Sequence, residues 1–336
     1  MNEKVGRYAK LTQEELNLKI EEAKKLLCEE ENTDLCEELI RYAGISSLAF
    51  AELAFEKKIL YPAILYNDAP EYIRDALIEM LDSEEIDKSL RVNHILMILA
   101  TIGGDKVCEA FKRWEVHPKK WRGNLYVGPS DYALEGNWTI NAQGQKEELT
   151  FSTCYGLEER ETYDRRDVLF GEVTREKCTN CQGSFMNLLT IDGRDERLAF
   201  LGVHGKINIK SCLKCLPWAE WIFCKYEEDG ESEVIPFISE SDNGLDDEEL
   251  QKMIDRHPIV LTEEPMPQDY CAQVEGSAIG GKPQWINDAQ YAECPECGKR
   301  MKHLAQLGSE HIEFDGTIYV QICTDCHIAA TCYQQS

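Results

Sequence analysis

The sequence predicts an α+β protein, with a helical N-terminal region followed by a β domain that carries two similar cysteine segments. Three observations lead to this fold class. Apolar residues recur at helical spacing through residues 11–125, and pairs of cysteines separated by two residues occur four times after residue 177. Alternating, strand-like stretches precede two of these pairs. The length of 336 residues suits two or three domains.

The helical region spans residues 1–125 and is expected to contain helices joined by short turns. Thr12 and Glu15 have the spacing of a capping box, which marks a helix start. A second helix is expected to begin at Asp34 and to stop at Gly44. Helices of this length, joined by short turns, favour antiparallel pairs stacked as a solenoid, with a plain helical bundle as the alternative.

Residues 70–114 resemble HEAT-type repeats, in which antiparallel helix pairs stack side by side. The resemblance covers two such units. It implies a concave helical face that could hold a polypeptide.

Residues 126–165 differ in composition and predict a β junction. They are rich in Gly, Asn, Trp and Tyr, and the run NAQGQ at 141–145 predicts a hairpin turn. An aromatic ligand groove is the alternative to simple packing here. The aromatic residues expected to pack the junction are Trp121, Tyr126, Tyr132, Trp138 and Tyr155.

Two cysteine segments carry the strongest signal in the chain. The first reads CTNC, thirty residues, then CLKC, and the second reads CPEC, twenty-five residues, then CTDC. This is the spacing of a four-thiolate zinc ribbon, because two intervening residues let one tight turn direct both sulfurs at a single ion. Four thiolates leave no open position for water, so structural zinc is favoured over catalytic zinc. The sequence predicts two zinc ions, with the ligands Cys178, Cys181, Cys212, Cys215, Cys294, Cys297, Cys323 and Cys326.

Disulfides, redox pairs and a histidine ligand are the alternatives to zinc bound by four cysteines. Disulfides need an oxidising compartment, and redox pairs do not explain two matched sets. His327 follows Cys326 directly and is an alternative ligand, while Gly298 after Cys297 is expected to take a positive φ. The remaining cysteines are expected to be buried thiols, namely Cys28, Cys36, Cys108, Cys154, Cys224, Cys271 and Cys332.

The two segments look like copies of one unit. Aligned on Cys212 and Cys323, the sequences GKINIKSCLKC and GTIYVQICTDC match in glycine, strand alternation and cysteines. FMNLL at 185–189 is paired with RMKHL at 300–304. These matches predict a duplicated β domain over residues 166–336. Its two units are 166–226 and 277–336, and an exchange of strands between the two halves is an open alternative.

An acidic connector, residues 227–276, separates the two units. Its stretch LDDEELQKMIDRH, 245–257, predicts one short helix with acidic residues near its N-terminus, where the helix dipole favours them.

The charge of the chain bears on its partners. The formal net charge is −26, and residues 126–336 hold 38 acidic against 18 basic side chains. Such a surface repels nucleic acids and attracts a basic protein. No apolar run reaches membrane-spanning length, and the N-terminus lacks the apolar stretch of a signal peptide, so a cytoplasmic protein without membrane contact is expected.

A glycine-rich motif precedes the second cysteine segment. Gly280, Gly281, Pro283 and Trp285 give GGxPxW, and Cys294, Cys297, Met301 and Gln306 continue as CPxCGxxMxxLxQ. Over residues 277–330 this resembles the YwqG-like family of bacterial proteins. It is also similar to the C-terminal part of programmed-cell-death-type ribosomal-protein chaperones.

The resemblance implies a β-rich, internally duplicated domain. Some of the relatives look like immunity proteins against toxins, and others look like chaperones of a basic ribosomal protein. The first cysteine segment lacks an equivalent of GGxPxW, so the resemblance extends to it only through the duplication.

No catalytic motif stands out in the sequence. HExxH, GxSxG and a phosphate-binding glycine loop are all missing, and Cys154 is expected to be a buried thiol rather than a nucleophile. The leading hypothesis is therefore a zinc-containing, cytoplasmic protein-binding module, immunity-like or chaperone-like toward a basic protein. The alternatives are a hydrolase-type enzyme with its site between the two β halves, and a purely structural scaffold.

Overall fold

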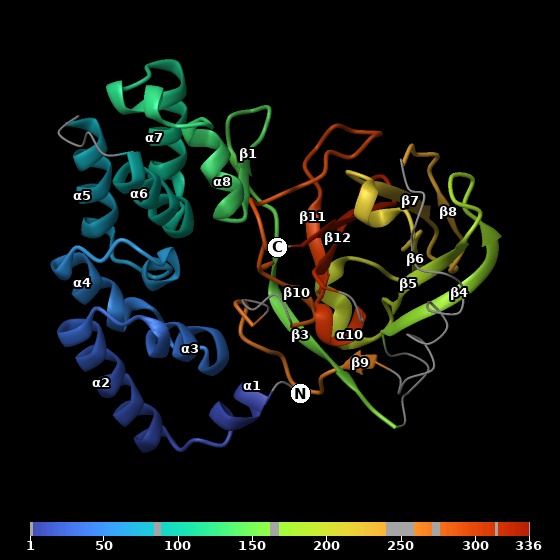
Figure 1. Cartoon of the computed structure of the whole chain (residues 1–336), viewed down its shortest axis with the longest axis horizontal. Coiled ribbons are helices and arrows are strands. Elements are labelled where there is room, and N and C mark those ends of the chain that lie inside the picture. Colours follow the sequence, from blue (N-terminus) through green and yellow to red (C-terminus); the bar gives the residue numbers. More distant parts are fainter. Residues whose placement is uncertain are drawn as a thin grey trace. The chain divides into compact units, whose positions relative to one another are not determined.

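The α+β fold class is confirmed. The computed structural model describes residues 3–83, 89–161, 168–239, 259–270, 276–312 and 315–335. The chain divides into a helical unit, Asn2–Leu149, and a β unit, Thr150–Ser336 (Figure 1). The short helix expected at 245–257 lies outside the described residues. No helix of the described residues is long and apolar enough to cross a membrane.

The helical unit begins with the capping box that the sequence predicts. The Thr12 hydroxyl accepts a hydrogen bond from the Glu15 amide at 3.3 Å, and the Glu15 carboxylate accepts one from the Thr12 amide at 2.8 Å. The α-helices of the unit are α1 (Glu3–Tyr8), α2 (Gln13–Glu30), α3 (Asp34–Ala43), α4 (Leu48–Lys57), α5 (Glu71–Asp82), α6 (Ser89–Ile102), α7 (Asp105–Val116) and α8 (Tyr132–Glu135). Three short 3₁₀ turns accompany them, η1 (Ala63–Tyr66), η2 (Lys120–Asn124) and η3 (Pro129–Asp131).

Three successive helices end on a left-handed residue. Gly44 has φ 63° after α3, as the sequence predicts, and Glu31 (52°) and Lys58 (60°) end α2 and α4 in the same way. The turns are therefore tight, and consecutive helices lie beside one another (Figure 1). Whether α5 to α7 are HEAT repeats stays a prediction.

The hairpin predicted around NAQGQ is confirmed. Strands β1 (Trp138–Ile140) and β2 (Lys146–Glu148) pair antiparallel. Trp138 packs on Phe111 with 5.7 Å between ring centroids, and its indole donates to the carbonyl of Ala100, so it belongs to the helical core. The expectation that Tyr126 is a packing residue is wrong, because its side chain is fully exposed.

The β unit contains an eight-stranded antiparallel sheet and a three-stranded one. The larger sheet has the order β8-β7-β13-β12-β11-β10-β3-β9, and the smaller has the order β4-β5-β6. A four-residue helix, α10 (Ser309–Ile312), and the 3₁₀ turns η4 (Glu196–Leu201) and η5 (Leu216–Trp218) lie between strands. The strands are β3 (Phe151–Glu159), β4 (Leu169–Lys177), β5 (Ser184–Asp192), β6 (Lys206–Ser211), β7 (Ile222–Tyr226), β8 (Ser232–Val234), β9 (Ile259–Leu261), β10 (Ala278–Gly281), β11 (Lys302–Leu307), β12 (Thr317–Cys323) and β13 (Ile328–Gln334).

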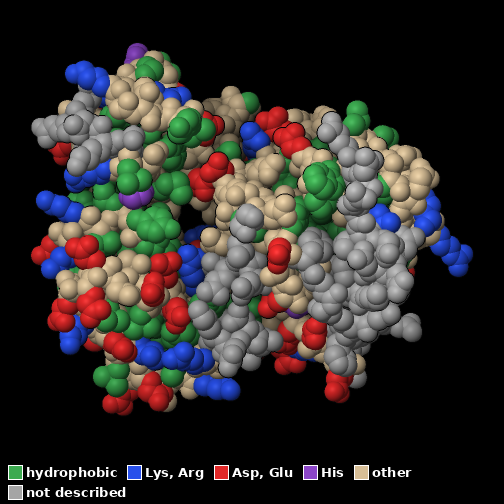
Figure 2. Space-filling view, viewed as in Figure 1, with side chains coloured by type: hydrophobic (Ala, Val, Ile, Leu, Met, Phe, Trp, Pro, Cys, Tyr) green, Lys and Arg blue, Asp and Glu red, His purple; other side chains and the backbone are tan. Residues whose placement is uncertain are grey.

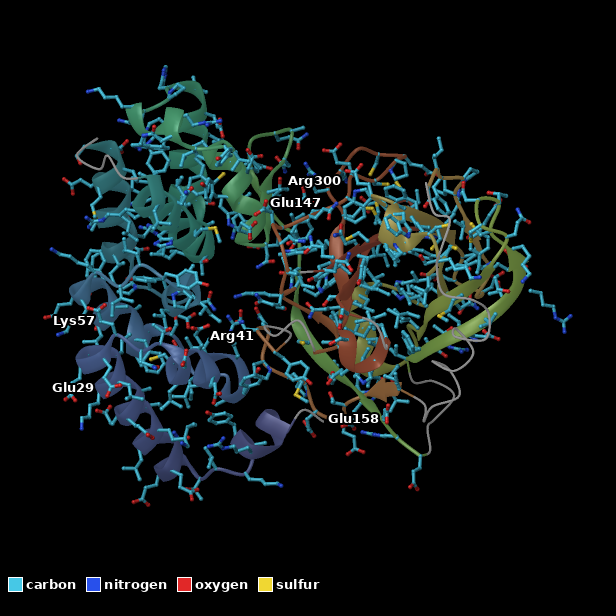
Figure 3. The ribbon with its side chains drawn as sticks, in the orientation of Figure 1. Glu29, Arg41, Lys57, Glu147, Glu158 and Arg300 are labelled. Atoms are coloured by element: carbon cyan, nitrogen blue, oxygen red, sulfur yellow. The ribbon has the colours of Figure 1, made fainter. Side chains whose placement is uncertain are left out.

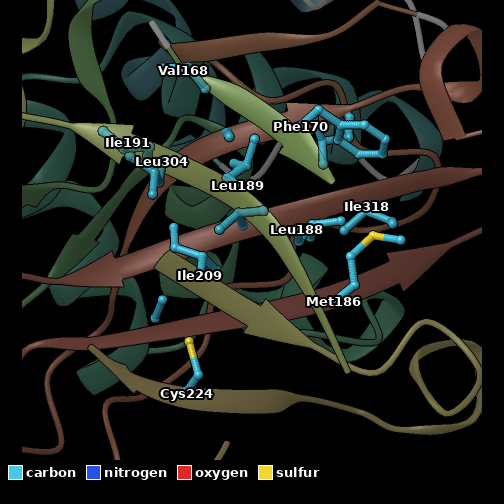
Figure 4. Close-up of a cluster of buried hydrophobic side chains, with 14 of the residues drawn as sticks. Val168, Phe170, Met186, Leu188, Leu189, Ile191, Ile209, Cys224, Leu304 and Ile318 are labelled. Atoms are coloured by element: carbon cyan, nitrogen blue, oxygen red, sulfur yellow. The ribbon is translucent and has the colours of Figure 1, made fainter. Parts of the chain in front are cut away.

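The main core of the β unit joins these two sheets. Every residue of β5 is buried, polar Asn187 and Thr190 included, so the strand is covered on both faces and shows no inside–outside alternation. Met186, Leu188 and Ile209 of the small sheet gather with Leu304 and Ile318 of the large one (Figure 4). Cys178, Cys212 and Cys215 of the first segment belong to this core, whereas Cys294 and Cys323 of the second pack in a smaller one.

Candidate metal centres

The first cysteine cluster lies at one end of the three-stranded sheet. Cys178 and Cys181 occupy the turn between β4 and β5, and Cys212 and Cys215 follow β6. Because β5 pairs with both neighbours and Met186 faces Ser211, the two turns meet at the same end. The four sulfurs lie within 4.8 Å of one another.

The second cluster repeats this arrangement in the large sheet. Cys294 and Cys297 precede β11, Cys323 is the last residue of β12, and Cys326 lies in the connection from β12 to β13. Lys302 faces Ile322 across the ladder, which brings the turns together, and these four sulfurs also lie within 4.8 Å of one another. Each cluster is formed by the cysteines of one segment, so the two halves do not exchange metal ligands, although β7 of the first half pairs with β13 in the large sheet.

The sulfur separations fit a tetrahedral ion. Four sulfurs at about 2.3 Å from one zinc are about 3.8 Å apart along each edge of the tetrahedron. The observed distances are 3.8 Å for Cys178–Cys215, 3.5 Å for Cys181–Cys212 and 3.8 Å for Cys297–Cys323. A disulfide would need about 2.0 Å, and all eight thiols are free. Each cluster could therefore hold a zinc ion.

The turn after the first cysteine pair is the same in both segments. Gln182 has φ 61° and donates its amide to the Cys178 carbonyl at 2.9 Å. Gly298 has φ 71°, which confirms the expected positive φ, and donates to the Cys294 carbonyl at 2.8 Å. This turn points backbone amides toward the sulfurs.

The protonation of the thiols shows what an ion would supply. Burial alone would raise the pKa of Cys178, but hydrogen bonds from the Cys181 and Asn180 amides, together with those from the Cys212 and Cys215 thiols, outweigh it and the pKa is lowered. The Lys299 amide lowers the pKa of Cys297. Burial and the neighbouring thiols raise the pKa of Cys212 and Cys323. In each site one cysteine therefore loses its proton easily, whereas the negative charge of that thiolate and burial oppose deprotonation of the others. All four cysteines can be thiolates together only with a cation beside them.

The two centres differ in exposure. In the first, Cys181 is partly exposed and the other three cysteines are buried within the main core. In the second, Cys297 is exposed and Cys326 is partly exposed. Solvent therefore reaches the second centre more easily.

His327 is not a ligand in this arrangement. Its ring stacks on Tyr226 with 5.4 Å between centroids and a 9° angle between planes, and its Nδ1 lies 3.9 Å from the Glu227 carboxylate. It takes φ 54° at the residue after Cys326.

The ladders refine the match between the two segments. The register shifts after Asn187 in β5 and after His303 in β11, each six residues beyond the second cysteine of the preceding pair. Phe185 therefore corresponds to Met301, and the pairing of FMNLL with RMKHL is wrong by one residue. The shared Met and Leu letters favoured the other offset, whereas the register shifts agree with the spacing from the cysteines.

The residues of the GGxPxW motif shape one loop rather than a cleft. Gly280 (φ 72°) and Gly281 (φ 71°) form an irregularity where β10 pairs with β3. A Cβ on Gly280 would lie 2.2 Å from the Thr153 carbonyl oxygen, and one on Gly281 would lie 2.8 Å from the Cys154 sulfur. Only glycine fits at either position.

The 282–292 loop then crosses the face of the large sheet. Pro283 and Trp285 are buried in it, and the Trp285 ring lies 4.3 Å from that of Tyr319. Gln306 accepts from the Gln284 amide at 2.8 Å and donates to the Gly276 carbonyl at 3.1 Å. Met301 is buried in a small core with Cys294 and Cys323 of the second centre.

Sequence reasoning missed two residues that fix this loop. Gln321 accepts from the Ala292 amide and donates to the Gln290 carbonyl, both at 2.7 Å. Gln334 accepts from the Asn287 amide at 3.0 Å and donates to the Asp288 carbonyl at 3.1 Å. The signal was available, since Gln321 interrupts the otherwise apolar run TIYVQIC.

Other titratable groups of the β unit are held neutral. Cys154 is buried, and burial raises its pKa to about 12, so it is no nucleophile at neutral pH. His303 is buried with neither ring nitrogen hydrogen-bonded within the described residues, and burial lowers its pKa to about 3.

The remaining cysteines of both units mostly follow the prediction. Cys36, Cys108, Cys224 and Cys332 are buried thiols as expected, Cys28 is only partly buried, and Cys271 lies outside the described residues.

Comparison with known proteins yields similarity without a function. No protein-family model matches the chain, and no solved structure matches it. The chain is similar to "Uncharacterized protein YpfL" of Salmonella typhimurium, with 26% identity over 349 aligned residues that cover 98% of this chain and 79% of that protein. The similarity thus spans both units and both cysteine segments.

Proposed function

We propose that the chain is a zinc-containing protein-binding module that binds a basic polypeptide, in a chaperone-like or immunity-like role. One observation carries this proposal. The hairpin of β7 and β8 presents five carboxylates within seven residues, namely Glu227, Glu228, Asp229 and Glu231 in its turn and Glu233 in β8. We call this segment the acidic hairpin.

The carboxylates of the acidic hairpin divide into two groups. Glu228 accepts a hydrogen bond from the His204 amide at 3.1 Å, and Asp229 accepts one from the Glu231 amide at 3.0 Å, so both stabilise the local fold. Glu227, Glu231 and Glu233 are exposed. No Lys or Arg of the described residues forms an ion pair with any of the five carboxylates. Three carboxylates are therefore available to cations of a partner.

The rest of the chain supports the same kind of partner. The net charge of −26 speeds the approach of a basic protein and opposes the approach of nucleic acid. Acidic side chains are spread over the visible face of both units (Figure 2). Eight reduced cysteine ligands suit a reducing compartment, and the cytoplasm is part of the proposal.

We also propose a common descent for the two cysteine segments and a relationship to the YwqG-like family. The order of strands and cysteine turns is the same in β4-β5-β6 and β10-β11-β12, and the register irregularities correspond. The GGxPxW residues have a defined structural task around one loop, which supports the resemblance to that family.

Charge reversal of the acidic hairpin tests the binding role. The purified chain would be used to capture partners from a bacterial lysate, followed by mass spectrometry, beside the triple variant Glu227→Lys, Glu231→Lys, Glu233→Lys. The matched control reverses Glu14, Glu30 and Glu56, which are exposed in the helical unit. We expect one basic polypeptide to be captured by the unaltered chain and by the control but lost from the hairpin variant. Equal capture by all three proteins would refute the proposal.

A further inference from the structure

The helical unit contains a groove of about 560 Å³ that the proposed function does not use. It lies where α2 and α4 end and α6 begins. Figure 3 shows Glu29 of α2 and Lys57 of α4 on the same outer edge of this unit. The lining residues are Glu31, Lys57, Lys58, Ile59, Leu60, Tyr61, Leu90, Arg91 and His94.

The groove is cationic in a chain that is strongly anionic. Lys57, Lys58 and Arg91 line it against a single carboxylate, Glu31. None of these three cations forms an ion pair with another described residue. Most other surface cations of the helical unit have a carboxylate partner, as Lys106 has in Asp75 at 2.8 Å.

The groove also exposes apolar and aromatic surface. Tyr61 is 70% exposed and Leu90 is 65% exposed, and both line the same groove, so their exposed surfaces lie together rather than scattered singly. The Tyr61 ring lies 5.6 Å from that of His94, and burial lowers the pKa of His94, so this wall of the groove is neutral. Leu90, Arg91 and His94 share one face of α6, because residues three or four apart are neighbours on a helix.

We propose that this groove binds an acidic peptide segment of a partner protein. Its carboxylates would pair with Lys57, Lys58 and Arg91, and one aromatic or aliphatic side chain between them would lie on Tyr61 and Leu90. The charge favours this ligand over a basic one. The mixed lining favours a peptide over a simple anion, which has no use for the apolar surface.

A nucleic acid is the competing class of ligand, since it too pairs with cations and stacks on aromatic rings. The net charge of the chain opposes both anions, but a nucleic acid carries a phosphate at every nucleotide and so brings charge against the anionic surface outside the groove, whereas a short acidic segment needs only the groove cations. The groove lies in the helical unit and the acidic hairpin lies in the β unit. Binding of an acidic peptide to the groove and binding of a basic polypeptide to the hairpin can therefore be tested independently.

Fluorescence polarisation with a labelled pentapeptide tests the proposal. The probe would read Asp-Glu-Phe-Glu-Asp, with Asn-Gln-Phe-Gln-Asn and Asp-Glu-Ser-Glu-Asp as matched peptides and a labelled twelve-nucleotide thymidine strand as the nucleic acid. We expect the first peptide to bind with a dissociation constant below about 1 mM, and the other two to bind at least about fivefold more weakly. Failure of the first peptide to bind at 1 mM, or stronger binding of the nucleotide strand, would overturn the proposal.

Substitutions of the groove residues test whether the peptide binds in the groove. Lys57→Glu combined with Arg91→Gln should weaken binding about tenfold, and Leu90→Ser about threefold, whereas the exposed Lys10→Glu should leave it unchanged. A second measurement needs no variant. The bound peptide should protect Lys57 and Lys58, but not Lys10, from reductive methylation detected by mass spectrometry. Equal modification of all three lysines with and without saturating peptide would contradict the proposal.

Discussion

The sulfur atoms of Cys181 and Cys212 lie 3.5 Å apart, although 31 positions separate the two residues in the chain. This distance is too long for a disulfide, which needs about 2.0 Å, and is close to the edge of a zinc–thiolate tetrahedron. The β5–β6 ladder holds the two turns at this separation. The fold of the small sheet therefore holds two sulfurs so close that, as thiolates, they would repel one another unless a cation lay between them.

Loss of one ligand should unfold the β unit selectively. Cys297→Ser removes one of four ligands at the second centre, and metal binding at such sites contributes folding energy directly. We expect one zinc fewer per chain and a free energy of unfolding of the β unit lower by at least about 3 kcal/mol. The helical unit should stay folded, since its buried residues form a core of their own.

Circular dichroism during heating, together with elemental analysis, checks this prediction. Cys28→Ser is the control, because Cys28 belongs to neither cluster and is only partly buried. One concerted melting transition of the whole variant chain at a much lower temperature would contradict the independence of the two units.

The two centres should lose their metal in a fixed order. Cys297 is exposed, whereas the first centre has only the partly exposed Cys181. A chelator in excess should therefore remove the second zinc at least about tenfold faster than the first. Mass spectrometry after brief alkylation should find Cys297 and Cys326 modified before Cys178 and Cys215. Simultaneous loss of both ions, or the reverse order, would contradict the exposure argument.

The cysteine clusters could be predicted from sequence because the chemistry fixes the spacing. A CxxC turn can direct two sulfurs at one ion only in a narrow range of geometries, so Cys178 to Cys215 and Cys294 to Cys326 were identified by pattern alone. The alignment of FMNLL with RMKHL followed shared Met and Leu letters, whereas counting from Cys181 and Cys297 places Phe185 with Met301, the offset with which the two register shifts also agree.

Acid should destabilise the β unit through His303. Burial lowers its folded-state pKa to about 3, while a histidine in an unfolded chain titrates near 6.5. As the pH falls below about 6.5, the unfolded state binds the proton first, so the free energy of unfolding should drop by about 1.4 kcal/mol per pH unit. Above that pH this contribution should be constant.

Denaturant titrations of the unaltered chain and of His303→Leu at pH 7.5 and pH 5.0 measure this effect. The unaltered chain should lose about 2 kcal/mol more than the variant between the two pH values. The comparison with the variant cancels any loss of zinc at acid pH. An equal loss in both proteins would show that His303 does not titrate as its burial requires.

The 282–292 loop should depend on Gln321. Gln321→Leu leaves the Ala292 amide and the Gln290 carbonyl without their partner, which should lower the free energy of unfolding by about 2–4 kcal/mol. Gln268→Leu, at an exposed position of the β unit, should change it by less than about 0.5 kcal/mol. Equal stability of the two variants in urea titrations would show that these hydrogen bonds contribute little.

Gln321 also shows why part of the fold escaped prediction. A glutamine in a strand of apolar residues is a visible anomaly, but its partners lie about thirty positions earlier, in a loop with no periodic pattern. Tyr126 shows the opposite failure, since aromatic composition predicts burial and the side chain is exposed. Local pattern identifies elements, whereas long-range contacts decide which side chains they bury.

Association with a basic partner should be sensitive to salt. The exposed carboxylates Glu227, Glu231 and Glu233 act over about 8 Å at physiological ionic strength. Raising the salt concentration from 50 to about 500 mM should lower the association rate constant by about tenfold or more, while the dissociation rate changes less. Surface plasmon resonance with the captured partner measures both rates, and salt-independent association would argue against electrostatic recognition.

Elemental analysis of the freshly purified, reduced chain tests the central claim most directly. The two four-cysteine clusters should give two zinc ions per chain by inductively coupled plasma mass spectrometry. One ion should remain in Cys297→Ser and in Cys181→Ser, and none in the double variant. A chain that contains no zinc, while folded and fully reduced, would contradict the account.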